Sequence, residues 1–114
     1  MRHVLLIDLV DEAQAIADYE AWHAAGAVPP AINASIRDAG ILAMEIYRTG
    51  NRLVMVMETA PGYDAAAKAA ADAASPAVQA WETQMDAVQR PLPWAMPGSK
   101  WTPADRIYSL DEQP

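Results

Sequence analysis

Residues 41–58 have the sequence ILAMEIYRTGNRLVMVME, which is the strongest indication of the fold in this chain. Its two apolar runs, Ile41 to Arg48 and Leu53 to Glu58, are rich in residues that favour strands. The segment Thr49-Gly50-Asn51 joins them, and a Gly/Asn turn between two such runs is a strong signal for a β-hairpin. The centre of the chain therefore predicts two adjacent antiparallel strands.

The same kind of pattern, followed outward from this hairpin, predicts the remaining elements. On the N-terminal side, the near-continuous apolar run Val4 to Val10 predicts a strand. Helix formers and breakers predict four helices, at residues 12–25 with Asp11 as N-cap, 30–39 ended by Gly40, 63–74, and from Pro76 with Ser75 as N-cap. From Pro91 onward four prolines predict an extended loop over residues 90–104, followed by a last strand at residues 106–110.

This order of elements predicts an α+β fold of the ferredoxin-like, split βαβ type. Its four-stranded antiparallel sheet would carry the helices on one face. A chain of 114 residues has room for one domain, so we expect residues 1–114 to form a single unit. Because the strands are apolar and the helices cover only one face, we expect the other face to be buried in a homodimer.

The composition excludes several classes of function. The chain is 53% hydrophobic and 20% charged, which is typical of a globular protein. Its net charge of −7 and its lack of clustered cations argue against nucleic-acid binding. The absence of cysteine removes disulfides, thiolate zinc sites and a cysteine nucleophile. No apolar run approaches the length of a membrane span, and Asp8 interrupts the only N-terminal one, so we expect a cytoplasmic protein without membrane contact.

His23 is the first candidate for chemistry. Tyr19 lies one helical turn before it, on the same face of the predicted helix. A histidine beside a phenol is suited to moving protons to and from hydroxyl groups. The competing interpretation is a histidine at the edge of the core that is hydrogen-bonded to a backbone carbonyl. No spacing typical of a metal site, a serine triad or a phosphate-binding loop is present, so we expect neither metal nor cofactor.

The tryptophans are the second group of candidates. Trp81 lies on the apolar stripe of the last predicted helix, where a core role is the simpler interpretation. Trp94 and Trp101 lie in the proline-stiffened loop. Rings held in this way can stack on the apolar face of a sugar, or they can close the edge of the sheet or the dimer interface.

Several blocks of sequence, taken in order, resemble the L-rhamnose mutarotase family, including its branch associated with L-fucose. The matching blocks are Ile7-Asp8-Leu9, Ile16 to His23, Ser35 to Ile41, Met44 to Leu53, Val78 to Glu82, and the Pro91 to Ala95, Pro97-Gly98 and Lys100-Trp101 pieces. The resemblance covers almost the whole chain, and it is the order and spacing of the blocks that make it specific.

The resemblance implies a dimeric α+β barrel that interconverts the α and β anomers of a 6-deoxy-L-sugar, L-fucose or L-rhamnose, without a cofactor. It implies that His23 is the catalytic proton-transfer residue and that Tyr19 contacts the substrate. Trp81 matches the first tryptophan of a pair in the rhamnose enzymes, whose second member is Glu82 here, and Met44 stands where those enzymes have a tyrosine. These two changes and the Pro-Leu-Pro-Trp segment that ends at Trp94 favour the fucose branch. Trp81, Trp94, Met44 and Glu82 are accordingly expected to join Tyr19 in binding the substrate.

One segment departs from the family pattern. After its histidine the family usually has a Trp-Pro-Glu block, whereas this chain has a longer segment, Ala24 to Ala31, without the Trp or the Glu. If that block shapes the sugar pocket, the departure implies a changed substrate or changed activity. The fold itself leaves an alternative function open, a dimeric α+β barrel that binds a small ligand or acts as a cofactor-free monooxygenase, since one scaffold hosts several activities. A third possibility, a pure interaction protein, predicts that side chains fill the cavity around His23.

Overall fold

The hairpin predicted at the centre of the chain is confirmed in the computed structural model, which describes residues 1–114. Strands β2 (Ile41–Thr49) and β3 (Arg52–Thr59) pair antiparallel around a two-residue turn, with Thr49 opposite Arg52. Gly50 has a φ of 57°, a left-handed conformation that favours glycine. The hairpin forms because its turn residues permit this reversal between two strand-forming runs.

Strand β1 (Arg2–Leu9) lies at the centre of the antiparallel sheet, whose order is β2-β3-β1-β4. One edge of β1 pairs with β3 along its whole length. The other edge is shared by two short strands, β4 (Gln89–Arg90) and β5 (Thr102–Pro103). The sheet thus has five strands where four were expected, because two short strands divide the fourth position.

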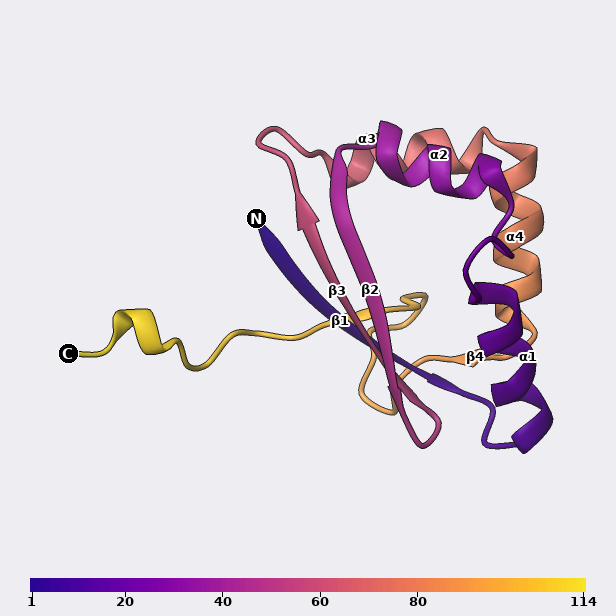
Figure 1. Ribbon diagram of the computed structural model, residues 1–114, viewed down its shortest axis with the longest axis horizontal. Helices are drawn as coiled ribbons and strands as arrows, with labels where there is room; N and C mark the ends of the chain where they lie inside the picture. The colour runs from indigo at the N-terminus through magenta and orange to yellow at the C-terminus, as the bar shows by residue number, and fades with distance from the viewer.

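The strand predicted at residues 106–110 is wrong. The chain pairs with β1 earlier, at Thr102–Pro103, and Ala104 N–H donates to the Val4 carbonyl at 2.8 Å. Beyond that point the chain leaves the sheet, so Ile107 is 96% exposed, and a 3-10 helix, η1 (Leu110–Glu112), follows near the C-terminus. Figure 1 shows this tail extending away from the rest of the molecule. The apolar residues of the tail have no neighbouring strand to pack against.

Four helices cover one face of the sheet (Figure 1). They are α1 (Ala13–His23), α2 (Pro30–Asp38), α3 (Ala65–Ala73) and α4 (Pro76–Asp86). Helix α1 ends at His23, two residues earlier than predicted, because Ala24 adopts an extended conformation. Its N-cap is Glu12 rather than Asp11.

The predicted start of α4 is confirmed, whereas α3 is shorter than predicted. The Ser75 side chain caps α4 by accepting a hydrogen bond from the Val78 N–H at 3.3 Å. Helix α3 begins only after Asp64, whose carboxylate accepts hydrogen bonds from the N–H groups of Ala66 and Ala67. Since a side-chain cap satisfies otherwise unpaired N–H groups, Asp64 decides where this helix begins.

The hydrophobic core lies between the sheet and helices α1 and α4. Ile7, Leu9 and Leu53 from the strands are almost completely buried, and they pack with Tyr19 of α1 and Met85 of α4. No helix of the structure is long and apolar enough to cross a membrane. The core fills only one end of the space between sheet and helices, and the remaining space is open.

Candidate active site

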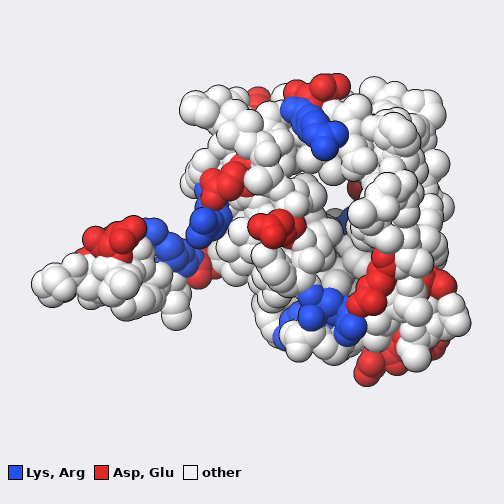
Figure 2. Space-filling view, in the orientation of Figure 1, with Lys and Arg blue, Asp and Glu red and all other residues white.

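The open space is a cavity of about 490 Å³ between the sheet and the four helices. Figure 2 shows it as an opening between the two layers. Its lining is mostly apolar and includes six of the residues singled out from the sequence: Tyr19, His23, Met44, Trp81, Glu82 and Trp101. Both the volume and the mixture of many apolar and few polar side chains are typical of a small-molecule site.

His23 is held at the end of α1 by a hydrogen bond between its Nδ1 and the main-chain oxygen of Tyr19, at 2.7 Å. A carbonyl oxygen only accepts hydrogen bonds, so Nδ1 carries the proton in the neutral ring. The other ring nitrogen, Nε2, is then unprotonated and able to take up a proton. The hydrogen bond to a backbone carbonyl is the one that the competing interpretation predicted, and the same histidine also lines the cavity.

The rings of Tyr19 and His23 stack on each other, with centroids 4.0 Å apart and planes 26° apart. Tyr19 is only 3% exposed, and this burial raises the pKa of its phenol to about 12, although the nearby Gln89 side chain lowers it in part. At neutral pH Tyr19 is therefore a hydrogen-bond donor that keeps its proton.

Burial has the opposite effect on the charge of His23. It lowers the pKa of the imidazole below 6.5, and the hydrogen bond to the Tyr19 carbonyl opposes this shift only in part. At neutral pH the imidazole is consequently neutral. A neutral imidazole with a free Nε2 can act as a general base, and after gaining a proton it can act as an acid.

Trp81 of α4 completes this aromatic group. Its ring meets the His23 ring nearly edge-on, at a centroid separation of 5.2 Å and an interplanar angle of 65°. The ring also lines the cavity. The residue assigned to the core by its helical stripe thus contacts the candidate base.

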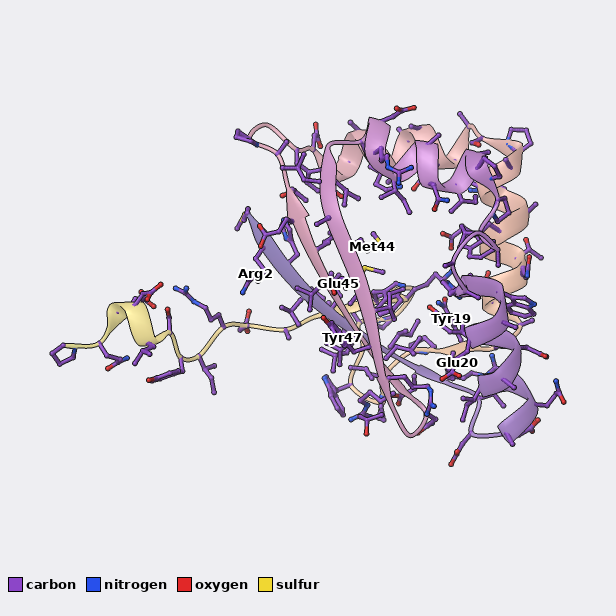
Figure 3. All side chains as sticks on the ribbon, in the orientation of Figure 1. Arg2, Tyr19, Glu20, Met44, Glu45 and Tyr47 are labelled. Carbon is purple, nitrogen blue, oxygen red and sulfur yellow. The ribbon has the colours of Figure 1, made fainter.

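Met44 and Glu82 both line the cavity, as expected from the sequence. Met44 of β2 and Tyr19 of α1 lie on two sides of it (Figure 3). Glu82 forms an ion pair with Lys100, which also bonds Asp86 at 2.7 Å. Burial opposes the charge on Lys100, but its hydrogen bonds to Asp86 and Glu82 raise the pKa of its ammonium group. This ion pair ties the proline-rich segment to α4.

Trp94 is not brought to the cavity. It is 64% exposed and lies over the guanidinium of Arg52, 5.4 Å from the ring centroid. Arg52 in turn donates two hydrogen bonds to the Asp8 carboxylate, at 2.7 and 3.1 Å. In this chain Trp94 therefore packs on Arg52, which is bonded to Asp8 near the end of β1.

Trp101, the other candidate ring of the proline-stiffened loop, does line the cavity. Several further lining residues were not singled out from the sequence. The sequence does not indicate that Gln89 lines a site, because it is a single amide at the end of an apolar stripe and belongs to no motif. The far end of the cavity carries further polar side chains that no motif indicates: Asn33, Ser35, Lys68 and Asp72.

The segment that departs from the family pattern also reaches the cavity, through Val28. The contribution of this segment to the cavity is thus an apolar side chain. No group of three or more His, Asp or Glu side chains is arranged to hold a metal ion.

A second, more open hollow of about 400 Å³ shares Tyr19, His23 and Ile46 with the first. Arg48 of β2 and Glu20 of α1 line it and form an ion pair with each other. The stacked Tyr19 and His23 rings therefore line both the cavity and this second hollow.

Comparisons with known proteins show the family to which the chain belongs. The sequence profile of the family described as L-rhamnose mutarotase matches residues 2–110. A curated relative, the L-fucose mutarotase of Xanthomonas campestris pv. campestris, is 50% identical over 107 residues, which are 94% of this chain and 86% of that protein.

The fold also matches a solved structure, an L-rhamnose mutarotase from Formosa agariphila. The TM-score is 0.63 and the match covers 96% of this chain and 98% of that one. At 12% identity, this likeness shows the fold, a ferredoxin-like α+β arrangement.

Proposed function

The chain belongs to the L-rhamnose mutarotase family and is a sugar mutarotase, and on this basis we propose that it interconverts the α and β anomers of L-fucose, with His23 as the acid–base residue. The observation that carries the proposal is the free Nε2 of His23, which results from the hydrogen bond of Nδ1 to the Tyr19 carbonyl inside the cavity. The 50% identical relative named L-fucose mutarotase supports L-fucose over L-rhamnose.

The reaction needs only proton transfers. The anomeric hydroxyl loses a proton while the ring oxygen gains one, so the hemiacetal opens to an aldehyde. Rotation about the C1–C2 bond turns the other face of the carbonyl toward the C5 hydroxyl, and closure reverses the proton transfers. One group that can both accept and return a proton is therefore the central requirement.

His23 meets this requirement, because its lowered pKa keeps it neutral and ready to take the anomeric proton. Tyr19 keeps its own proton and serves as a donor to a sugar oxygen. Trp81 and Met44 supply apolar surface for the ring and the 6-deoxy methyl group. Glu82, paired with Lys100, bounds the cavity and contacts the substrate.

The test is the rate of anomer exchange of L-fucose, measured by NMR saturation transfer with and without the protein. We expect faster exchange with L-fucose than with L-rhamnose, D-glucose or D-galactose under the same conditions. If the protein accelerates the exchange of none of these sugars, the proposal is overturned and a ligand-binding role for the scaffold is favoured.

We also propose that the protein is a cytoplasmic homodimer in which residues 1–114 form one domain. Two observations support the dimer: the face of the sheet opposite the helices carries no helix (Figure 1), and the tail exposes Ile107, Tyr108 and Leu110. Large exposed apolar side chains are typical of an interface. Sedimentation equilibrium that gives the mass of a single chain would contradict this proposal.

A further inference from the structure

Gln89 is a buried amide that has unused hydrogen-bonding capacity. Only 7% of the residue is exposed, and its Oε1 atom has no hydrogen-bond partner. The main chain of Gln89 is fixed, because it pairs with Leu9 of β1 as the first residue of β4. The backbone thus holds this amide in place although its oxygen bonds nothing.

Such an arrangement costs free energy in the empty protein. A buried carbonyl oxygen that loses water without gaining a donor is destabilising, and nearly all buried polar atoms in proteins have a partner. The one other buried side-chain oxygen without a partner is Oγ1 of Thr102. Gln89 lines the 490 Å³ cavity whereas Thr102 does not, so only Gln89 faces a space where a ligand can supply the missing donor.

The neighbourhood of Gln89 suits a hydroxyl group. Gln89 approaches the phenol of Tyr19, and both residues line the cavity beside His23. The phenol offers a donor and the free amide oxygen offers an acceptor. A hydroxyl group is both a donor and an acceptor, so it can satisfy the two residues at once.

We propose that Gln89 is a substrate-specificity residue, whose Oε1 accepts a hydrogen bond from a non-anomeric hydroxyl of the bound sugar. The inference rests on the proposed mutarotase function and deepens it. A primary amide neither gains nor loses a proton near neutral pH, so Gln89 cannot replace His23 at the anomeric centre. Its contribution is to recognise one hydroxyl and thereby to orient the ring.

The experiment compares the wild type with Gln89→Met on L-fucose and on its 2-, 3- and 4-deoxy analogues, by anomer exchange. Methionine has a similar length but no strong acceptor. For L-fucose we expect kcat/KM to fall by about 10- to 100-fold, the range for a buried polar partner left unpaired. For the one analogue that lacks the recognised hydroxyl, the two proteins should differ by less than about twofold.

A stability measurement separates this role from a structural one. The empty Gln89→Met protein should be at least as stable to urea as the wild type, because the substitution removes an oxygen without a partner. If Gln89→Met does not fold, Gln89→Leu offers a second apolar side chain for the same comparison.

Thr102→Val is the matched control. It also removes a buried oxygen without a partner, but one that does not line the cavity. We expect its activity on L-fucose and on all three analogues to equal that of the wild type.

An unchanged kcat/KM for L-fucose in Gln89→Met overturns the inference, and so does an equal loss for every analogue. Failure of the proposed function looks different, because the wild type itself then fails to accelerate exchange. In that case saturation-transfer difference NMR reports binding of the same sugars. The inference is supported if the wild type binds L-fucose and one deoxy analogue whereas Gln89→Met binds only that analogue. If the wild type binds none of the sugars, both proposals are overturned.

Discussion

The Nδ1 atom of His23 lies 2.7 Å from the main-chain oxygen of Tyr19, one turn earlier in the same helix, while the two rings stack at 4.0 Å. One residue thus fixes both the tautomer and the orientation of the imidazole. His23 is the last residue of α1, so its ring lies at the C-terminal end of the helix.

His23→Gln should reduce kcat by about 10²- to 10⁴-fold, the usual contribution of a general acid–base group. Glutamine keeps a polar side chain but cannot exchange a proton, so KM should change much less. The measurement is NMR saturation transfer on L-fucose. His3→Gln is the control, because His3 bonds Thr59 Oγ1 at 3.0 Å and does not line the cavity. Equal rates for His23→Gln and the wild type would exclude His23 as the base.

The activity should fall in acid with a midpoint below pH 6.5. Burial lowers the pKa of His23, so the neutral ring persists to a lower pH than a free imidazole does, and protonation then removes the base. The pH profile of kcat/KM, together with an NMR titration of the His23 ring protons, checks this. A midpoint clearly above 6.5 would contradict it.

Tyr19 should make the protein less stable in alkali. The unfolded phenol ionises near pH 10, whereas the folded phenol has a pKa of about 12, so the unfolded state loses its proton first. The stabilisation is complete below pH 10 and is lost as pH rises toward 12, by about 2 to 3 kcal/mol in total. Urea unfolding of the wild type and of Tyr19→Phe across this interval measures the difference, and parallel curves would refute the assignment.

The two tryptophans should behave differently when shortened. Trp81→Ala removes a ring that contacts His23 and lines the cavity, so we expect KM to rise and kcat to fall, with a combined loss in kcat/KM of at least about tenfold. Trp94→Ala removes an exposed ring stacked on Arg52, so kcat/KM should stay within about twofold, with a stability change of about 0.5–1 kcal/mol. A large activity loss in Trp94→Ala would place that ring in the site after all.

Lys100→Met should loosen the segment that carries Trp101. Lys100 bonds Glu82 and Asp86 of α4, and half-exposed ion pairs of this kind contribute up to about 1 kcal/mol. We therefore expect KM to rise by about two- to fivefold with little change in kcat, and added salt to raise KM of the wild type in the same direction. Arg106→Met, which breaks an exposed ion pair with Glu112 in the tail, is the control and should leave KM unchanged.

Much of the fold follows from local sequence. The Gly50-Asn51 turn, the Ser75 cap and the first-turn prolines of α2 and α4 act over a few residues, so their effects could be predicted without the rest of the chain. The last strand could not, because two candidate segments compete for one edge of β1. Thr102–Pro103 reaches that edge first, and the more strand-like residues that follow have nowhere to pair.

The pairing of Tyr19 with His23 was determined by the sequence itself, because residues four positions apart on a helix share one face. The other members of the site come from distant parts of the chain, and only the tertiary structure decided which of them meet. It brought Trp81 and Gln89 to the cavity, left Trp94 on Arg52, and buried an amide oxygen without a partner. The physical reason is that helix periodicity acts within one element, whereas packing and sheet pairing decide which elements meet.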